Sequence, residues 1–146
     1  MQKATDQDLE SIWALDYLVL GNPSRKAFLV NAVTAGQCLA ARIGGTVVGF
    51  GVLEHSFYSH GFISLLIVHP DHRRHGVAKA LISHIESISP TQKLFTSTNK
   101  SNVIARRLFE SLGYVRSGYI ENLDEDDPEI IYFKRLEKPD TALTRK

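Results

Sequence analysis

The stretch Val68-His69-Pro70-Asp71-His72-Arg73-Arg74-His75-Gly76-Val77-Ala78 joins a buried strand to an amphipathic helix. The run before it, residues 62–68, is apolar on both faces, as expected of a central strand that is covered on both sides. Pro70 ends the strand, and apolar residues at helical spacing follow over residues 77–88. The sequence therefore predicts a strand, a short turn and a helix over residues 62–88.

The composition of this turn is typical of an anion-binding site. The first N–H groups of a helix have no acceptor within the helix and lie at the positive end of its dipole. Gly76 and Ala78 keep side-chain bulk low, so an anion can approach the backbone, and Arg73, Arg74 and His75 add positive charge. These features predict a pyrophosphate pocket, whereas the alternative is a turn whose arginines are only solvated. Neither the P-loop pattern nor Gly-x-Gly-x-x-Gly occurs in the chain.

Hydrophobic spacing predicts the remaining elements on both sides of the turn. Two helices precede it, one starting at a Thr5 cap and one at Pro23, and two strands joined at Gly44-Gly45 follow them. After the turn come a short strand, a helix with Ile104 among its inward residues, and two last strands around an acidic loop. The predicted fold class is α/β (mixed α+β) with a mixed sheet. It forms one domain over residues 1–137, with a frayed tail over residues 138–146.

Composition and charge exclude several classes of function. A formal net charge of +1 over 146 residues gives no general attraction to nucleic acid or to a membrane surface. No apolar run of about 18 residues could span a bilayer, and no signal-peptide core opens the sequence, so a cytoplasmic location is predicted. Cys38 is the only cysteine, which excludes an intramolecular disulfide. His69, His72 and His75 are spaced by three, but a turn scatters them, so no metal site is predicted.

Two motifs resemble those of the Gcn5-related N-acetyltransferase (GNAT) family. Arg73-Arg74-His75-Gly76-Val77-Ala78 matches the family signature Gln/Arg-x-x-Gly-x-Gly/Ala. Downstream, the late helix resembles the segment Asn-x-x-Ala-x-x-Phe/Leu-Tyr-Glu-x-x-Gly-Phe/Tyr, through Asn102, Ala105, Leu108-Phe109-Glu110 and Leu112-Gly113-Tyr114. Residues 117–124 also resemble an ending found in small, stand-alone bacterial members. The resemblance implies a mixed, mostly antiparallel sheet with a splayed central strand and helices on both faces.

The resemblance also implies acetyl-CoA as the cosubstrate and assigns its contacts. Backbone groups of residues 66–68 would pair with the pantetheine arm as if it were another strand. The N–H groups of residues 74–78 would hold the pyrophosphate, and Asn102 would meet the pantetheine or the reacting end. The implied cofactor-binding residues are Leu66, Ile67, Val68, Arg73, Arg74, His75, Gly76, Val77, Ala78, Asn102 and Phe109.

Acetyl transfer to an amine needs a base, a donor for the developing oxyanion and a proton for the leaving thiolate. A backbone N–H such as that of Val68 would donate a hydrogen bond to the oxyanion. Family members often carry a glutamate on the central strand and a tyrosine in the late helix, but Ser64 and Phe109 stand at those places. A serine hydroxyl is a poor base and phenylalanine has no proton to donate. Other groups must therefore contribute.

Side chains near the ends of two strands are the candidates for those missing roles. Glu54 is the leading candidate for the base and His55 the next, although each also fits an exposed strand end. Tyr58 and Tyr119 could donate the proton, as could water, because a thiol with a pKa of about 8.5 leaves without much help. The predicted catalytic residues are Glu54, Ser64 and Val68.

The acidic loop at residues 121–129 bears on the acceptor. In this fold the loop between the last two strands tends to border the acceptor site, where Glu121 and Asp124 would attract a cationic amine. A solvated turn is the alternative. The predicted function is acetyl transfer from acetyl-CoA to a primary amine of a small cationic molecule within a ternary complex. The alternatives are a protein N-terminal or lysine acetyltransferase acting on a basic peptide and a non-catalytic acyl-CoA sensor, and a homodimer is left open.

Overall fold

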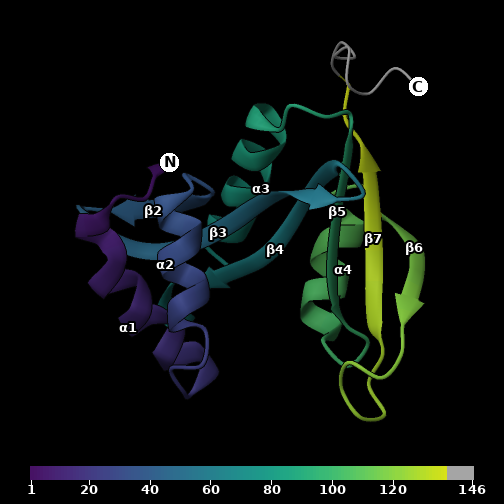
Figure 1. Ribbon diagram of the computed structural model, residues 1–146, viewed down its shortest axis with the longest axis horizontal. Helices are drawn as coiled ribbons and strands as arrows, with labels where there is room; N and C mark the ends of the chain where they lie inside the picture. The colour runs from purple at the N-terminus through teal and green to yellow at the C-terminus, as the bar shows by residue number, and fades with distance from the viewer. Residues whose placement is uncertain (138–146) are drawn as a thin grey trace. The chain divides into compact units, whose positions relative to one another are not determined.

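The computed structural model describes residues 1–137, so the predicted tail at residues 138–146 lies outside the described residues (Figure 1). Seven strands form one sheet in the order β1-β2-β3-β4-β5-β7-β6. The strands are β1 (Gln2–Lys3), β2 (Cys38–Ile43), β3 (Thr46–Phe57), β4 (His60–Val68), β5 (Lys93–Asn99), β6 (Val115–Ile120) and β7 (Glu129–Arg135). The helices are α1 (Leu9–Leu20), α2 (Lys26–Thr34), α3 (Val77–Ile88) and α4 (Val103–Ser111), with short 3-10 turns η1 (Asp6–Asp8) and η2 (Pro70–His72).

The pairing of the strands confirms the predicted fold class. Strands β2 and β3 are antiparallel and meet at Gly44-Gly45, as the hairpin signal predicts. Strands β5 and β7 are antiparallel, as are β6 and β7, whereas β4 and β5 are parallel. The sheet is therefore mixed and mostly antiparallel. None of the described helices is long and apolar enough to cross a membrane.

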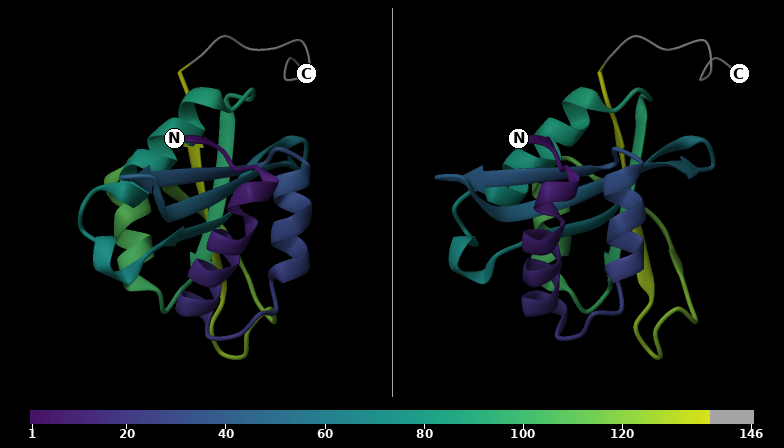
Figure 2. Two further views of the ribbon diagram at one scale, coloured as in Figure 1. Left: turned by 90° about the vertical axis from the view of Figure 1, so that its left-hand side faces the viewer. Right: turned by 60° about the vertical axis from the view of Figure 1, so that its left-hand side comes forward.

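Contacts within the chain divide it into two compact units. The first unit consists of Met1–Leu53 with Leu65–Ser87, and the second of Glu54–Ser64 with residues from Ile88 to the end of the described part. In the first unit α1 and α2 lie on one side of β2 and β3 and α3 lies on the other (Figure 2). Phe50 and Val52 of β3 pack with Ile12 and Leu29 on the side of α1 and α2. Helices therefore cover both faces of this part of the sheet.

Two glycines of β3 allow α3 to pack closely on the opposite face. A Cβ at Gly49 would lie 3.0 Å from Val77 Cγ1, and one at Gly51 would lie 3.1 Å from Ile85 Cδ1. Contacts this short are tighter than most Cβ contacts, so a side chain at either position would require its neighbours to shift. Helix α3 therefore approaches the backbone of β3 closely at both glycines.

The two N-terminal helices begin and end through local hydrogen bonds. The Thr5 N–H donates to Asp8 Oδ2 over 2.8 Å, which confirms the predicted cap, and α1 begins after one 3-10 turn. The predicted start of the second helix at Pro23 is wrong. The Ser24 N–H donates to Asn22 Oδ1 over 3.0 Å, so these residues form a turn and α2 begins at Lys26.

The one polar residue on the inner face of α1 is explained by an ion pair. The side chain of Asp16 is 4% exposed, and its Oδ1 lies 2.7 Å from Arg25 Nη2. Arg25 Nε also donates to Asp16 Oδ2 over 3.2 Å, so the contact is bidentate. The pair connects α1 to the residue before α2.

In the second unit α4 packs against β7. The rings of Phe109 and Tyr132 have centroids 5.9 Å apart, and both side chains are buried. The prediction that Ile104 faces inward is wrong, because its side chain is 82% exposed.

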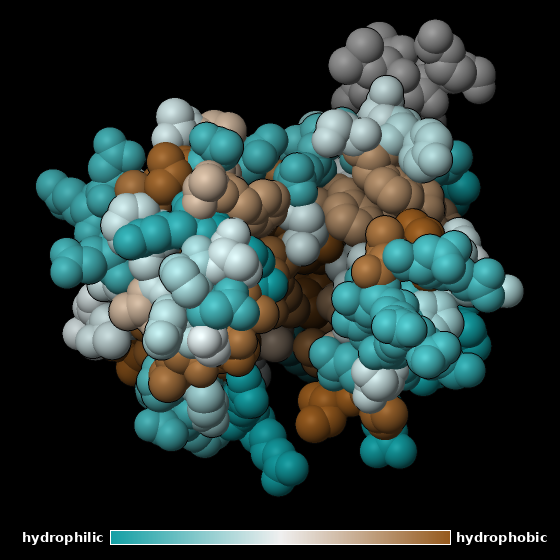
Figure 3. Space-filling model, turned by 60° about the horizontal axis from the view of Figure 1, so that its bottom comes forward, coloured by the Kyte–Doolittle hydropathy of each residue, from teal (hydrophilic) through white to brown (hydrophobic). Residues whose placement is uncertain are grey.

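Strand β6 is the edge strand of the sheet, and every one of its residues is exposed, including Val115. Figure 3 shows hydrophobic residues among hydrophilic ones on the exposed surface.

Candidate functional site

The turn between β4 and α3 has a defined backbone path. The His69 N–H donates to the Val48 carbonyl over 2.8 Å, which fixes the end of β4 against β3. The His72 N–H then donates to the His69 carbonyl over 2.9 Å within η2. Arg73 Nε donates back to the Val68 carbonyl over 3.4 Å. The first unit therefore presents residues 73–76 on an anchored turn.

Backbone conformation directs the N–H groups at the start of α3. Arg74 has a φ of +67° and Gly76 a φ of +78°, two left-handed residues that flank His75. A Cβ at Gly76 would meet no heavy atom of the described residues within 4 Å, so the positive φ, and not crowding, requires glycine there. The first intrahelical bond runs from the Ala80 N–H to the Gly76 carbonyl over 2.9 Å. The N–H groups of the preceding helical residues therefore have no acceptor within the helix.

Two arginines and a histidine lie in the turn that leads to these N–H groups. Arg73, Arg74 and His75 are all exposed. Within the described part of the chain, the Arg74 guanidinium makes no hydrogen bond or ion pair, so its charge is not neutralised. A helix N-terminus preceded by an uncommitted guanidinium suits a phosphate group. The first unit thus brings together the predicted pyrophosphate residues 73–78.

Three histidines lie next to one another at this turn. The ring centroids of His69 and His72 are 5.7 Å apart, and those of His72 and His75 are 6.3 Å apart. His69 Nδ1 accepts from the Asp71 N–H over 3.0 Å, so a neutral ring carries its proton on Nε2. Over residues 1–137, no group of three or more histidine, cysteine, aspartate or glutamate side chains is arranged to hold a metal ion.

The predicted pantetheine-binding residues lie at the end of β4. Ile67 is buried with the cluster beneath α1 and α2, whereas Leu66 and Val68 pack against the cluster around α3. Side chains on both faces therefore hold this segment in place. In the first half of β4, which belongs to the second unit, Gly61, Phe62 and Ile63 pair with β5.

The remaining predicted catalytic and cofactor residues belong to the second unit. Glu54 is half-buried near the end of β3. Ser64 Oγ is buried and has no hydrogen-bond partner among residues 1–137. Asn102 is exposed and caps α4, because its Oδ1 accepts from the Ala105 N–H over 3.1 Å. Phe109 is only 4% exposed, so its side chain belongs to the core of this unit.

A buried tyrosine beside Phe109 was not predicted from the sequence. Tyr132 is fully buried, and its hydroxyl donates to Glu110 Oε2 over 2.8 Å. Arg106 Nε donates to the same hydroxyl oxygen over 3.4 Å. Burial raises the pKa of Tyr132, and Glu110 adds to the rise while Arg106 opposes it. The tyrosine therefore stays protonated and connects α4 to β7. An aromatic residue in an apolar strand carries no signal for this role.

Hydrogen bonds engage part of the acidic loop. Asn99 Nδ2 donates to Asp124 Oδ2 over 2.8 Å, so the Asp124 carboxylate, predicted to meet the acceptor, also holds β5. Glu121 is exposed and makes no hydrogen bond or ion pair with any other described residue. Of the two acids predicted to bind the acceptor, Asp124 is therefore engaged within the fold and Glu121 is not.

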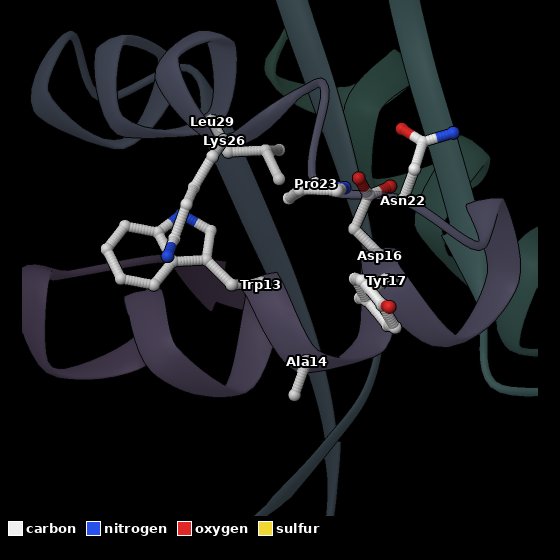
Figure 4. A pocket seen from close by; sticks show the side chains of 8 residues that line it. All are labelled: Trp13, Ala14, Asp16, Tyr17, Asn22, Pro23, Lys26 and Leu29. Atoms are coloured by element: carbon white, nitrogen blue, oxygen red, sulfur yellow. The ribbon is translucent and has the colours of Figure 1, made fainter.

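A separate pocket of about 220 Å³ lies between α1 and α2 in the first unit (Figure 4). Lys26 passes over the Trp13 indole, with its Nζ 4.4 Å from the ring centroid. Asp16 lines the pocket but is already paired with Arg25. None of the predicted site residues lines it.

The chain is similar to known proteins in both sequence and fold. The chain matches the model of the Acetyltransferase (GNAT) family over residues 6–114. A solved acetyltransferase of the GNAT family from Bacillus cereus ATCC 10987 is 41% identical to it, over 94% of this chain and 96% of that chain, with a TM-score of 0.89. The comparison with curated proteins gave no match.

Two more distant structures share the fold. The ribosomal-protein-S18-alanine N-acetyltransferase of Escherichia coli is 18% identical, over 97% of this chain and 96% of that chain, with a TM-score of 0.82. A protein from Bacillus anthracis named as a streptothricin acetyltransferase, solved with acetyl coenzyme A, is 24% identical over 67% of this chain and 61% of that chain, with a TM-score of 0.59. At these identities the likeness concerns the fold alone.

The fold and these matches define the class of protein as an acyltransferase. The chain belongs to the GNAT family of acetyltransferases. It is accordingly an acetyl-CoA-dependent N-acetyltransferase, which confirms the predicted enzyme class and cosubstrate.

Proposed function

We propose that this chain transfers the acetyl group of acetyl-CoA directly to a primary amine of a small cationic molecule within a ternary complex. The observation that carries the proposal is the turn at residues 73–78, where exposed cations accompany helix N–H groups that have no acceptor in the helix. We further propose that residues 1–137 act as one N-acetyltransferase domain. The family match draws residues from both units, which supports this.

The cofactor is proposed to bind through backbone groups and arginines. The N–H groups of residues 74–78 hold the pyrophosphate, and Arg73 and Arg74 neutralise its charge. The backbone of residues 66–68 pairs with the pantetheine arm. Asn102, exposed at the start of α4, meets the pantetheine or the reacting end, and Phe109 supports that helix from the core.

In the proposed transfer the amine nitrogen attacks the acetyl carbonyl carbon and forms the new C–N bond. The Val68 N–H donates to the developing oxyanion. Glu54 accepts the proton that the amine loses, directly or through water. The C–S bond then breaks, and the CoA thiolate takes a proton from solvent.

Two other residues have limited roles in this scheme. Ser64 stands where family members often carry a glutamate, and its hydroxyl is assigned a hydrogen-bonding role because it is a poor base. Cys38 is fully buried, and burial, together with the charge of Asp8, raises its pKa to about 12. A thiol that stays protonated at neutral pH is a poor nucleophile, which favours direct transfer over a covalent acyl-enzyme.

The acceptor is proposed to be cationic because of the acidic loop. Residues 121–126 are all exposed, and Glu121 is uncommitted within the described residues, so it is the first candidate to meet an ammonium group. A basic peptide is the second candidate, since the same carboxylates would attract it. The fold does not choose between them, because one distant neighbour is named for a ribosomal protein and another for streptothricin.

Release of free CoA thiol tests the proposed function. Purified protein and acetyl-CoA are mixed separately with polyamines, aminoglycosides, amino acids and basic peptides. Thiol release above background with a small cationic amine supports the proposal, whereas release with basic peptides alone favours the second candidate. Binding of acetyl-CoA without release by any amine would instead identify a sensor.

The role of Glu54 is tested by the variant Glu54→Gln. Loss of the base should lower kcat about 10²-fold and remove the acidic limb of the pH–rate profile. His55→Gln, at the neighbouring exposed position, is the matched control. An unchanged profile in Glu54→Gln would remove this carboxylate from the mechanism.

A further inference from the structure

The loop between β6 and β7 is bonded to the junction between β5 and α4. Ser101 donates both its N–H and its Oγ–H to Asp127, over 3.0 Å to Oδ1 and 2.6 Å to Oδ2. The Lys100 N–H donates to the Pro128 carbonyl over 2.8 Å. Asn99 Nδ2 reaches the loop as well, through the Asp127 carbonyl at 3.4 Å. Each residue from 99 to 101 is therefore held by the loop.

Asp127 differs from the acids that precede it in the loop. Both of its carboxylate oxygens accept a hydrogen bond, and the residue is half-buried. Glu125 and Asp126 are exposed and make no hydrogen bond or ion pair within the described residues. A negative charge that meets a backbone N–H and a hydroxyl at once makes strong, geometrically specific bonds. The position of Asp127 is thus fixed toward the junction and not toward solvent.

The junction carries the N-terminal end of α4. The Asn102 N–H donates to the Asn99 carbonyl over 2.9 Å, so Asn102 follows directly from the segment that Asp127 holds. On its other side the junction is held by Arg106, whose Nη1 donates to the Lys100 carbonyl over 2.9 Å. The same guanidinium contacts Tyr132 of β7. Asp127 and Arg106 therefore hold Ser101 and Lys100, the two residues that directly precede Asn102.

We propose that Asp127 is a positioning residue for the transfer reaction. It does not touch either substrate, but it fixes the residue that, under the proposed function, meets acetyl-CoA at the start of α4. This inference rests on that proposed function. It also divides the acidic loop into a structural carboxylate at Asp127 and exposed carboxylates that remain available to a cationic acceptor.

The test compares Asp127→Ala with Asp127→Asn and measures the KM of each substrate separately. Asp127→Ala should raise the KM for acetyl-CoA about five- to tenfold, with little change in the KM for the amine. Asn keeps an oxygen for the Ser101 N–H and offers an N–H to Ser101 Oγ, so Asp127→Asn should restore most of the affinity. Glu125→Gln removes the same charge from the loop and serves as the matched control.

Ser101→Ala provides a second variant in case Asp127→Ala does not fold. It removes one of the two bonds and should raise the KM for acetyl-CoA about two- to threefold. A changed KM for the amine alone, or a lowered Tm with both KM values unchanged, would overturn the positioning role. If the wild-type chain does not bind acetyl-CoA, the proposed function and this inference both fail. If it binds normally and the Asp127 variants match it, only this inference fails.

Discussion

Two loops of this molecule each carry a run of charged residues, one basic and one acidic, and they differ in how many of those charges make hydrogen bonds within the fold. The turn at residues 73–76 carries exposed cations, and Arg74 has no hydrogen bond or ion pair within residues 1–137. The loop at residues 121–129 carries a run of acids, of which Asp124 and Asp127 accept hydrogen bonds from the β5–α4 junction. The first loop has charge left for a ligand, whereas the second uses part of its charge to hold the fold.

The difference shows that a charged run is only a candidate site until its partners are known. Glu129 at the start of β7 illustrates the point, because its Oε2 accepts from Ser97 Oγ over 2.7 Å. A carboxylate that already accepts a hydroxyl is less available to an incoming cation. Variants on the two loops, and on the residues around them, should therefore separate effects on stability from effects on binding.

The largest expected effect is on stability, from a residue of the family motif that lies in the core. Phe109→Ala should lower the free energy of unfolding by about 3–5 kcal/mol, because a buried aromatic ring between Tyr114 and Tyr132 is replaced by a cavity. Urea denaturation measures the change. Ile104→Ala on the same helix is the control and should stay within about 0.5 kcal/mol of wild type, since Ile104 is exposed. Equal losses in both variants would contradict the assignment of Phe109 to the core.

The next effect should appear in binding and not in stability. The double variant Arg73→Ala, Arg74→Ala should raise the KM for acetyl-CoA about 10²-fold, because two charge-assisted contacts to phosphate are lost. Its Tm should stay close to that of wild type, since both side chains are exposed. Arg116→Ala combined with Arg135→Ala removes the same charge from exposed positions of the second unit. If the two double variants bind acetyl-CoA equally, net charge and not the turn accounts for the affinity.

A carboxylate of the first unit should show a pH-dependent effect on stability. The hydrogen bond from Arg42 and the Thr5 N–H lower the pKa of Asp8 below 3.8. A lowered pKa in the folded state stabilises the fold above the ordinary value, and this stabilisation is lost as the pH falls through the folded pKa. Asp8→Asn should therefore be less stable than wild type by about 1–2 kcal/mol at neutral pH.

The difference between Asp8→Asn and wild type should shrink as the pH falls through the lowered pKa of folded Asp8, because a protonated carboxyl group carries no charge. Denaturant titrations at several pH values measure it. Asp6→Asn is the control, because Asp6 is exposed and makes no hydrogen bond or ion pair within the described chain. A pH-independent loss in Asp8→Asn would show that the charge is not what stabilises the cap.

The smallest expected effect is on the stability of two variants, each of which replaces a glycine with a positive φ. Gly76→Ala and Gly44→Ala should each lower the stability by about 1 kcal/mol, because both φ angles are left-handed, +78° and +58°. Only Gly76→Ala should also weaken acetyl-CoA binding, since only Gly76 lies at the turn. Thermal unfolding and acetyl-CoA titration of the two variants measure both effects. Equal affinity for acetyl-CoA in the two variants would argue against backbone contacts at Gly76.

The sequence predicts most elements of the fold because their signals are local. The glycine hairpin, the apolar run of β4 and the apolar face of α3 each depend on residues that are close together in the sequence. The late start of α2 depends on the turn that Asn22 and Pro23 form, and the apolar pattern does not reveal it. Strand β1 spans only Gln2–Lys3 and was not predicted, since two residues carry no period.

The candidate site is also predictable only where its signals are local. The turn before α3 is one continuous segment, so its composition alone is enough to propose that it binds a pyrophosphate. The contacts of Asp127 and Tyr132 cannot be predicted in this way. Asp127 bonds to Ser101 and Tyr132 bonds to Arg106, and each partner lies 26 residues away in the chain. Such pairs depend on strand order and register, and one sequence does not encode them in any local pattern. The sequence therefore predicts the proposed cosubstrate site more readily than the contacts of Asp127 and Tyr132, which depend on the fold.

The most direct test of the central claim is a titration of the ¹⁵N-labelled protein with CoA, followed by amide NMR shifts. Backbone binding of the pyrophosphate at the start of α3 predicts that the amides of residues 74–78 move most and saturate with one CoA per chain. In the Arg73→Ala, Arg74→Ala variant the same amides should need about 10²-fold more CoA. Amides that move elsewhere while those of residues 74–78 stay in place would contradict the account.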